Sequence, residues 1–145
     1  MIDVRPLLPD EVPLVDSHLP LSRLDKAQTY LVAWDGDAPV GHAHVAWEGT
    51  EVGVPEVQDV FVLPERRREG IASLLTAAAE DAARSRGFDR ISLGVSADKK
   101  EVQRLYESLG YEDSGVEPVR VRGTIMLRGE PFDVDDTIVY LTKAL

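Results

Sequence analysis

The sequence contains no cysteine among its 145 residues. Disulfide bonds and thiolate metal sites are therefore excluded, and the composition fits a reducing compartment, for which we expect the cytoplasm. No apolar run approaches the roughly 20 residues of a membrane-spanning helix. The first residues also lack the basic and then apolar segments of a secretory signal. These absences predict a protein that is neither secreted nor inserted in a membrane.

Positive charge is scarce as well. The chain has 16 Lys and Arg residues against 26 Asp and Glu residues, which gives a net charge of -10. A nucleic-acid partner needs a basic face, so the charge argues against nucleic-acid binding. A negative field suits a cationic or amine substrate, although acidity also serves solubility alone. Against this background the consecutive arginines Arg66, Arg67 and Arg68 stand out.

The hydrophobic pattern predicts a single α+β domain over residues 1–145, with a mixed sheet covered by helices. Strands are expected over residues 1–6, 29–34, 40–47, 56–63, 89–95, 124–127 and 137–141. Helices are expected from residue 9, around 21–27, over 69–86 and over 99–109. On the longest of these helices the predicted inner stripe is Ile71, Leu74, Leu75, Ala78 and Ala82. The strand–helix–strand order after residue 56 implies a right-handed crossover and a parallel pair.

Residues 57–72 combine a strand, a basic turn and the start of a helix. Backbone N–H groups at a helix N-terminus lack internal partners, the helix dipole favours an anion there, and Gly70 lets an anion approach the main chain. Cations at this end of a helix are unfavourable without an anion, so the turn predicts a pyrophosphate site. The alternative is a basic helix start with a structural glycine. The sequence has no P-loop and no G-x-G-x-x-G motif.

The same turn, R-R-E-G-I-A over residues 67–72, resembles the [Q/R]-x-x-G-x-[G/A] signature of the GNAT superfamily of N-acetyltransferases. As in that family, an apolar strand ending in V-x-P comes before it, at residues 62–64. A helix, a strand and a second helix ending in L-Y-x-x-x-G-[F/Y] come after it, the last at residues 105–111. The resemblance is strong over residues 57–113 and poor beyond residue 114.

The resemblance implies a GNAT-like fold, in which a mixed, mostly antiparallel sheet is flanked by helices and a cleft opens between two diverging parallel strands. It also implies acetyl-CoA or another acyl-CoA as co-substrate. The residues that would bind the pyrophosphate, chiefly through main-chain N–H groups, are Arg67, Arg68, Gly70, Ile71 and Ala72. The residues whose exposed backbone would pair with the pantetheine arm are Val60, Phe61 and Val62.

Tyr106 lies in the L-Y-x-x-x-G-Y segment, and the resemblance implies that it protonates the departing thiolate. A phenol suits this task because it is a neutral donor at pH 7. The alternative is a core aromatic, which its spacing with Val102 and Leu109 also supports. Family members often carry Asn seven residues before this Tyr, whereas this chain has Lys99, which could instead reach a cofactor phosphate.

An ammonium must lose a proton before it attacks a thioester, and the candidate bases are Asp59 and Glu56, acting directly or through water. Of the two, we expect Asp59 to be the base, because an acidic residue inside an apolar strand is uncommon unless it has a specific role. The alternative is an Asp paired with a neighbouring backbone group or Arg. His42 and His44 alternate on one strand and could line an acceptor pocket, but no further ligand spacing supports a metal site.

The sequence thus predicts an N-acetyltransferase that moves an acetyl group from acetyl-CoA to an amine of a small molecule or peptide by direct attack. One alternative is a non-catalytic acyl-CoA-binding sensor of the same fold. Another is a purely structural or interaction domain. A homodimer formed through the C-terminal strands is a further expectation, and the acceptor itself is not specified by any motif.

Overall fold

One curved sheet runs through the computed structural model, which describes residues 1–23, 29–127 and 130–145. Its strands are β1 (Ile2–Pro6), β2 (Thr29–Asp35), β3 (Ala38–Ala46), β4 (Glu56–Val62), β5 (Arg90–Ser96), β6 (Glu112–Asp113), β7 (Val119–Leu127) and β8 (Glu130–Ala144). They are ordered β1-β2-β3-β4-β5-β8-β6, and β7 pairs with β8. Within the described residues β4 and β5 form the one parallel pair. The predicted α+β fold is confirmed.

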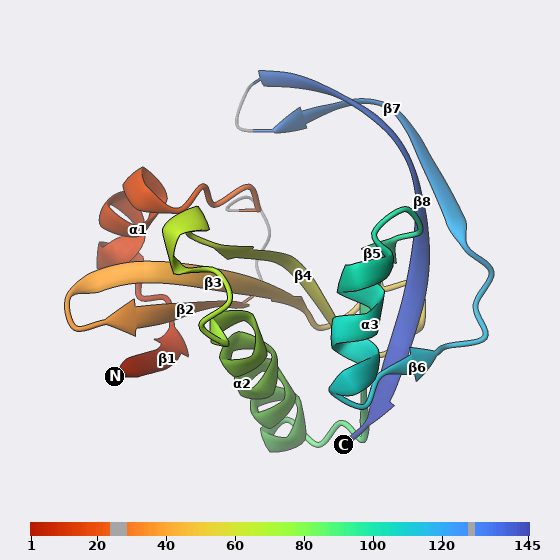
Figure 1. The fold of residues 1–145 in the computed structure, drawn as a ribbon, viewed down its shortest axis with the longest axis horizontal. Helices are drawn as coiled ribbons and strands as arrows, with labels where there is room; N and C mark the ends of the chain where they lie inside the picture. Colours follow the sequence, from red (N-terminus) through yellow and green to blue (C-terminus); the bar gives the residue numbers. More distant parts are fainter. Residues whose placement is uncertain (24–28, 128–129) are drawn as a thin grey trace.

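Helices cover both faces of the sheet (Figure 1). They are α1 (Val12–His18), which follows a 3-10 turn at Pro9–Glu11, α2 (Ile71–Ser85) and α3 (Lys100–Ser108). Along β2, Tyr30, Val32 and Trp34 belong to the core around α1, whereas Leu31 and Ala33 belong to the core under α2 and α3. This alternation follows from the two-residue period of a strand. No helix within the described residues has the length and hydrophobicity to span a membrane.

Helix α2 packs closely on β3 because β3 has a glycine at the contact. A Cβ at Gly41 would lie 3.0 Å from the Phe61 carbonyl oxygen and 3.2 Å from the Leu75 side chain. The buried row of α2 is Ile71, Leu75, Ala79 and Ala83. The predicted stripe is therefore wrong in part, and Leu74 is 45% exposed. Residues four apart form the ridge that packs against a neighbouring element, and this ridge excludes Leu74.

The C-terminal strands are longer than the sequence pattern predicts. Beyond their base, β7 and β8 leave the body as a two-stranded arm that curves above it (Figure 1). One face of this arm is polar, so its apolar content is low and the strand signal is weak. The helix expected around residues 21–27 falls mostly on residues 24–28, outside the described part of the chain.

A buried polar contact joins α2 to the end of α3 and to β8. The Tyr111 hydroxyl donates to Glu80 Oε2 at 2.9 Å, and Lys143 Nζ donates to Glu80 Oε1 at 3.0 Å. Burial, with the Glu80 charge second, raises the pKa of the Tyr111 phenol well above its usual range. The final Tyr of the L-Y-x-x-x-G-Y segment therefore fixes the helix that carries Tyr106 against the rest of the fold.

Candidate active site

The site begins where β4 separates from β5. These strands pair only at Glu56 with Ser92 and at Val57 with Leu93, although β4 continues to Val62. On its other side β4 remains paired with β3 along its length. Among the described residues, the second half of β4 therefore has no strand partner on the β5 side. Apart from the Val62 carbonyl, which accepts a hydrogen bond from Arg67, the backbone groups on that side are free to bind a ligand.

A β-bulge at Asp59 accompanies this separation. His44 pairs with Gln58 and His42 with Phe61, so two residues of β4 lie opposite one of β3. Asp59 has a φ of 53°, in the left-handed region that few non-glycine residues adopt. Its Oδ2 accepts hydrogen bonds from Ser22 Oγ at 2.8 Å and from the Tyr30 hydroxyl at 2.9 Å. Bulges bend a strand, and these two hydroxyls hold this bulge in place.

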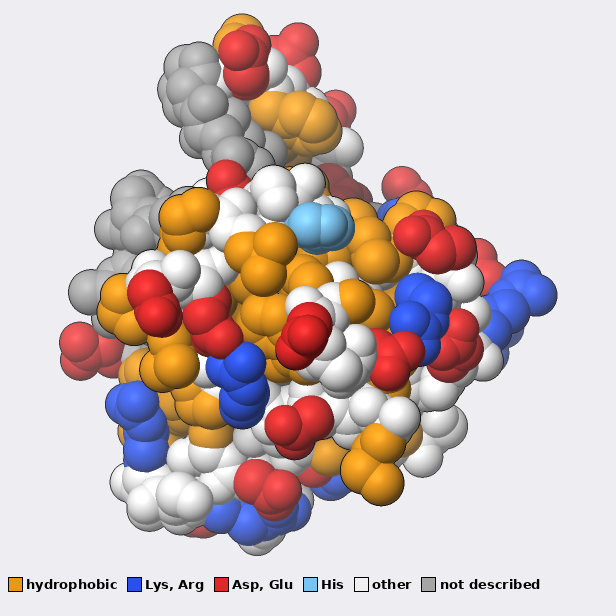
Figure 2. All heavy atoms as spheres, turned by 90° about the vertical axis from the view of Figure 1, so that its left-hand side faces the viewer, with side chains coloured by type: hydrophobic (Ala, Val, Ile, Leu, Met, Phe, Trp, Pro, Cys, Tyr) orange, Lys and Arg blue, Asp and Glu red, His pale blue; other side chains and the backbone are white. Residues whose placement is uncertain are grey.

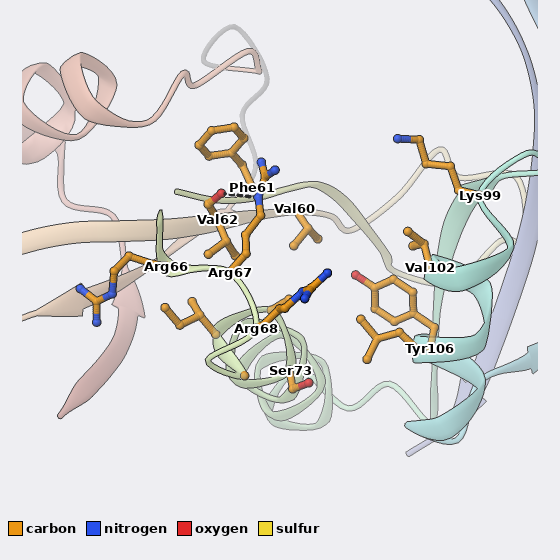
Figure 3. A pocket seen from close by; sticks show the side chains of 14 residues that line it. Val60, Phe61, Val62, Arg66, Arg67, Arg68, Ser73, Lys99, Val102 and Tyr106 are labelled. Carbon is orange, nitrogen blue, oxygen red and sulfur yellow. Dashed lines mark hydrogen bonds between the residues drawn. The ribbon is translucent and has the colours of Figure 1, made fainter. Parts of the chain in front are cut away.

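A cavity of about 600 Å³ extends from the end of β4 across the start of α2 to α3. It is lined by all eight residues that were predicted to bind the cofactor: Val60, Phe61, Val62, Arg67, Arg68, Gly70, Ile71 and Ala72. Lys99, Val102 and Tyr106 of the α3 side form the opposite wall (Figure 3). Leu105 of α3 also lines the cavity. The tertiary fold thus brings the two motifs of the sequence to one cavity.

The start of α2 forms an anion cradle within this cavity. Arg68 has a φ of 66° and Gly70 a φ of 81°, so the backbone turns in the left-handed region at both positions. Successive N–H groups in such a turn point to one concave side. The N–H groups of residues 68–73 have no acceptor within the described chain. A Cβ built on Gly70 would meet no atom within 4 Å, so the space in front of this backbone is open.

The three arginines point in different directions (Figure 3). Arg66 forms ion pairs with Asp35 at 3.0 Å and Glu69 at 3.1 Å and points away from the cavity. Arg67 Nε donates to the Val62 carbonyl at 3.1 Å, so this side chain braces the end of β4. Arg68 points across the cavity toward the α3 side. All three arginines line the cavity, but the Arg66 guanidinium is held in two ion pairs, whereas Arg67 supports the strand end and Arg68 extends across the cavity.

Tyr106 stands between this cavity and a second one of about 220 Å³, which lies in the gap between β4 and β5. Val60, Val102 and Tyr106 line both cavities. Burial raises the pKa of the Tyr106 phenol, and the neighbouring Thr76 hydroxyl partly offsets this. Tyr106 is therefore both a buried residue of the core and a neutral proton donor at the meeting point of the two cavities.

The two candidate bases have different surroundings. Asp59 lines the smaller cavity, but its Oδ2 is occupied by two hydroxyl donors. Glu56 is buried, its Oε2 accepts a hydrogen bond from Gln58 Nε2 at 2.6 Å, and its Oε1 has no partner within the described residues. Burial raises the pKa of the Glu56 carboxyl, and the Gln58 hydrogen bond offsets part of this.

Both strand histidines are fully buried. His42 Nε2 lies 2.9 Å from the Pro20 carbonyl oxygen, and His44 Nδ1 lies 3.2 Å from Gln58 Oε1. Burial lowers the pKa of each imidazole, so both are neutral at pH 7. Gln58, which contacts His44 and Glu56 and lines the smaller cavity, was missed at the sequence level. Its alternation with Glu56 on one strand face was the available signal.

These features together form a phosphate cradle, a free strand edge and a buried phenol around one cavity. A family model described as the acetyltransferase (GNAT) family matches residues 3–111. The chain belongs to this family. The match ends at the second Tyr of the L-Y-x-x-x-G-Y segment, so the β7–β8 arm lies outside it.

Two curated relatives and one solved structure place this GNAT chain among known proteins. It is 35% identical over 83 residues to the uncharacterized N-acetyltransferase YjgM of Escherichia coli (strain K12), covering 57% of this chain and 50% of that protein. It is 34% identical over 87 residues to a mycothiol acetyltransferase of Clavibacter michiganensis subsp. michiganensis, covering 60% and 28%. The matches thus span half or less of these relatives.

A GNAT family acetyltransferase from Elizabethkingia anophelis, solved with acetyl-CoA bound, superposes with a TM-score of 0.68. The superposition covers 99% of this chain and 98% of that one at 14% sequence identity. At this identity the likeness shows a shared fold, which includes the arm that the family model leaves unmatched.

Replacing Glu56 with Gln tests the cost of burying this carboxyl. Because its folded pKa is raised, ionisation destabilises the fold as the pH rises above the ordinary value of 4.5. Glu56→Gln should therefore raise the free energy of unfolding in urea by about 0.5–2 kcal/mol at pH 8 and change it little at pH 4. Asp59→Asn, which weakens two native hydrogen bonds, should lower it. If Glu56→Gln lowers the free energy of unfolding at pH 8, the conclusion that the ionised Glu56 carboxylate destabilises the fold is wrong.

Proposed function

We propose that residues 1–145 form one domain that transfers an acetyl group from acetyl-CoA to an amine, in the cytoplasm. The observation that carries the proposal is the single cavity that joins the amide cradle at α2 to the buried phenol of Tyr106. Family membership supports the same reaction class. Curated relatives named as N-acetyltransferases support the transfer to an amine.

The residues of the cavity fit the chemical parts of coenzyme A. The free N–H groups of residues 68–73 suit its pyrophosphate, and the Arg68 and Lys99 side chains add positive charge on two sides. The unpaired edge of β4 at Val60, Phe61 and Val62 suits the amides of its pantetheine arm. When bound, acetyl-CoA supplies the activated thioester whose acetyl group is transferred.

Glu56 and Tyr106 divide the proton transfers in this proposal. As the amine nitrogen bonds to the thioester carbonyl carbon, Glu56, which is buried beside the smaller cavity, accepts a proton from that nitrogen through water. As the carbon–sulfur bond breaks, Tyr106 donates its proton to the sulfur, which leaves an amide and a free thiol. Burial raises the pKa of the Glu56 carboxyl and so makes it a stronger base than an ordinary carboxylate, whereas Oδ2 of Asp59 is occupied by the Ser22 and Tyr30 hydroxyls.

The acceptor in this proposal is a small molecule or peptide that carries an amine. One relative of this chain is named an aminoalkylphosphonate N-acetyltransferase, and another is named a mycothiol acetyltransferase. The net charge of -10 attracts a cationic amine by long-range steering. The size of the gap between β4 and β5, about 220 Å³, suits a narrow amine-bearing group at the reaction centre.

A second copy of the chain is the partner that we propose for the β7–β8 arm. One face of the arm is apolar, and Val121, Ile125 and Phe132 on it are 37%, 42% and 55% exposed. Figure 2 shows the arm projecting from the body with hydrophobic side chains beside acidic ones. A two-stranded ribbon is marginally stable alone. The outer edge of β7 pairs with no described strand, and two such edges related by a two-fold axis would complete each other.

Blocking the cradle should abolish cofactor binding. Gly70→Asp places a side chain and a negative charge in the open space before the free N–H groups, so we expect acetyl-CoA affinity in calorimetry to fall at least about tenfold. Gly36→Asp is the matched control, because Gly36 also has a positive φ and open space, in the β2–β3 turn. Equal affinities for the two variants would sink the cradle assignment.

Removing the proton donor should slow turnover without weakening cofactor binding. Tyr106→Phe keeps the ring and loses the hydroxyl, so we expect kcat to fall about 100-fold with acetyl-CoA affinity unchanged. Free thiol released from acetyl-CoA over a panel of amines measures the rate. If the wild-type protein binds acetyl-CoA but releases no free thiol with any amine of the panel, the sensor alternative is supported instead.

The arm proposal predicts a dimer in solution that depends on the apolar face. Phe132→Asn should shift the mass measured by light scattering toward that of one chain, because burial of this ring is lost. Thr124→Asn, on the polar face of the same arm, is the control and should leave the mass unchanged. A wild-type protein that stays monomeric at high concentration refutes this partner.

A further inference from the structure

Three polar side chains form a continuous line across β3 and β4. Gln58 Nε2 donates to Glu56 Oε2 at 2.6 Å, and Gln58 Oε1 lies 3.2 Å from His44 Nδ1. Glu56 is 8% exposed and His44 is fully buried. Buried polar groups are rarely placed together without a structural or chemical use. This line ends at the residue to which the proposed reaction assigns the first proton transfer.

The hydrogen bonds fix the orientation of every group in the line. An ionised carboxylate only accepts hydrogen bonds, so the Gln58 amide must turn its nitrogen to Glu56 and its oxygen to His44. The His44 proton must then sit on Nδ1, and Nε2 carries the lone pair. Neither His44 Nε2 nor Glu56 Oε1 has a partner within the described residues. The line therefore binds one carboxylate oxygen of Glu56, Oε2, and leaves the buried Oε1 without a hydrogen-bond partner among the described residues.

We infer that Gln58 and His44 are positioning residues that hold the Glu56 carboxylate with one oxygen anchored and the other, buried and unpaired among the described residues, able to take the proton of the acceptor amine through water. The inference rests on the proposed function with Glu56 as base. Gln58 also lines the smaller cavity with Tyr106 and Val60. The line thus connects the reaction centre to the buried carboxylate, while Asp59 serves the bulge.

Other charged and titratable groups act on Glu56 from the elements around it. Burial is the largest influence and raises the pKa of its carboxyl, the Gln58 hydrogen bond lowers it, Arg23 lowers it and Glu51 raises it. Burial, with the Glu56 charge second and the Glu51 charge third, raises the pKa of the Tyr140 phenol of β8. Asp59 lies on the same strand, and His44 is neutral because burial lowers its pKa. The Gln58 hydrogen bond offsets part of the increase that burial causes in the Glu56 pKa. Losing this hydrogen bond should therefore raise the Glu56 pKa further.

A direct titration tests the positioning role without relying on turnover. The pKa of Glu56 can be measured from its side-chain carboxyl carbon by NMR in wild type, Gln58→Leu and His44→Leu. We expect both substitutions to raise it, and Gln58→Leu to raise it more, because Gln58 bonds the carboxylate directly. His44→Asn retains an N–H near the position of Nδ1 and should restore the wild-type value. An unchanged Glu56 pKa in Gln58→Leu would overturn the inference.

Kinetics provide the second readout. The acid limb of the pH–rate profile should move to higher pH in Gln58→Leu, with kcat about tenfold lower at pH 6 and close to wild type at pH 9. Gln103→Leu is the matched control: it removes two hydrogen bonds, to the carbonyls of Ser96 and Ala97, and neither bond involves Glu56, Gln58 or His44. Its profile should keep the wild-type acid limb.

The outcomes separate this inference from the proposed function. If Gln58→Leu lowers kcat equally at all pH values, its role is structural and the positioning role is refuted. If Glu56→Gln retains full activity while the NMR titrations behave as expected, the line positions Glu56 but Glu56 is not the base. If Gln58→Leu fails to fold, the pair His44→Leu and His44→Asn decides, because the inference still requires a raised Glu56 pKa in the first variant and the wild-type Glu56 pKa in the second.

Discussion

The bent strand β4 is the feature on which the rest of the site depends. Two hydroxyls, from Ser22 and Tyr30, bind one oxygen of Asp59 and hold its backbone at a φ of 53°. The extra residue at this bulge bends β4 away from β5 after only two paired positions. The cavity, its free backbone edge and the opening through the sheet all follow from this separation. An acid inside an apolar strand thus has a structural use that the strand pattern cannot reveal.

The two faces of the sheet carry different parts of the proposed chemistry. On the face of α2 and α3 lie the cradle and Tyr106, and their surroundings are mainly apolar. The Gln58 line to Glu56 and His44 runs across β3 and β4, where burial opposes charge. Burying a carboxyl without full pairing costs stability. The gap between β4 and β5 is where groups held on the two sides can meet.

The arm is where this chain departs most from what its family membership explains. The family model stops at Tyr111, yet β7 and β8 continue well past it and are shared with a solved GNAT neighbour in fold. Its polar face carries Arg120 paired with Asp135, and its apolar face is exposed. A ribbon of this kind acquires a stable environment from outside its own two strands. The region that the shared motifs do not cover is therefore where the proposed dimer contact lies.

Local signals in the sequence were enough for the parts of the site that are contiguous in the chain. The turn at residues 67–72 and the strand edge before it are set by a glycine, a helix start and a proline, all within one short stretch. The roles of Arg66, Asp59 and Gln58 could not be read this way. Each depends on a partner far along the chain, Asp35, Tyr30 or His44, and on a strand register that the bulge shifts by one residue. The sequence alone therefore identified the turn and the strand edge that line the larger cavity, whereas only the tertiary structure decided that two hydroxyls hold Asp59 Oδ2 and that Glu56 Oε1 is left without a partner among the described residues, because long-range pairing rather than local pattern sets those contacts.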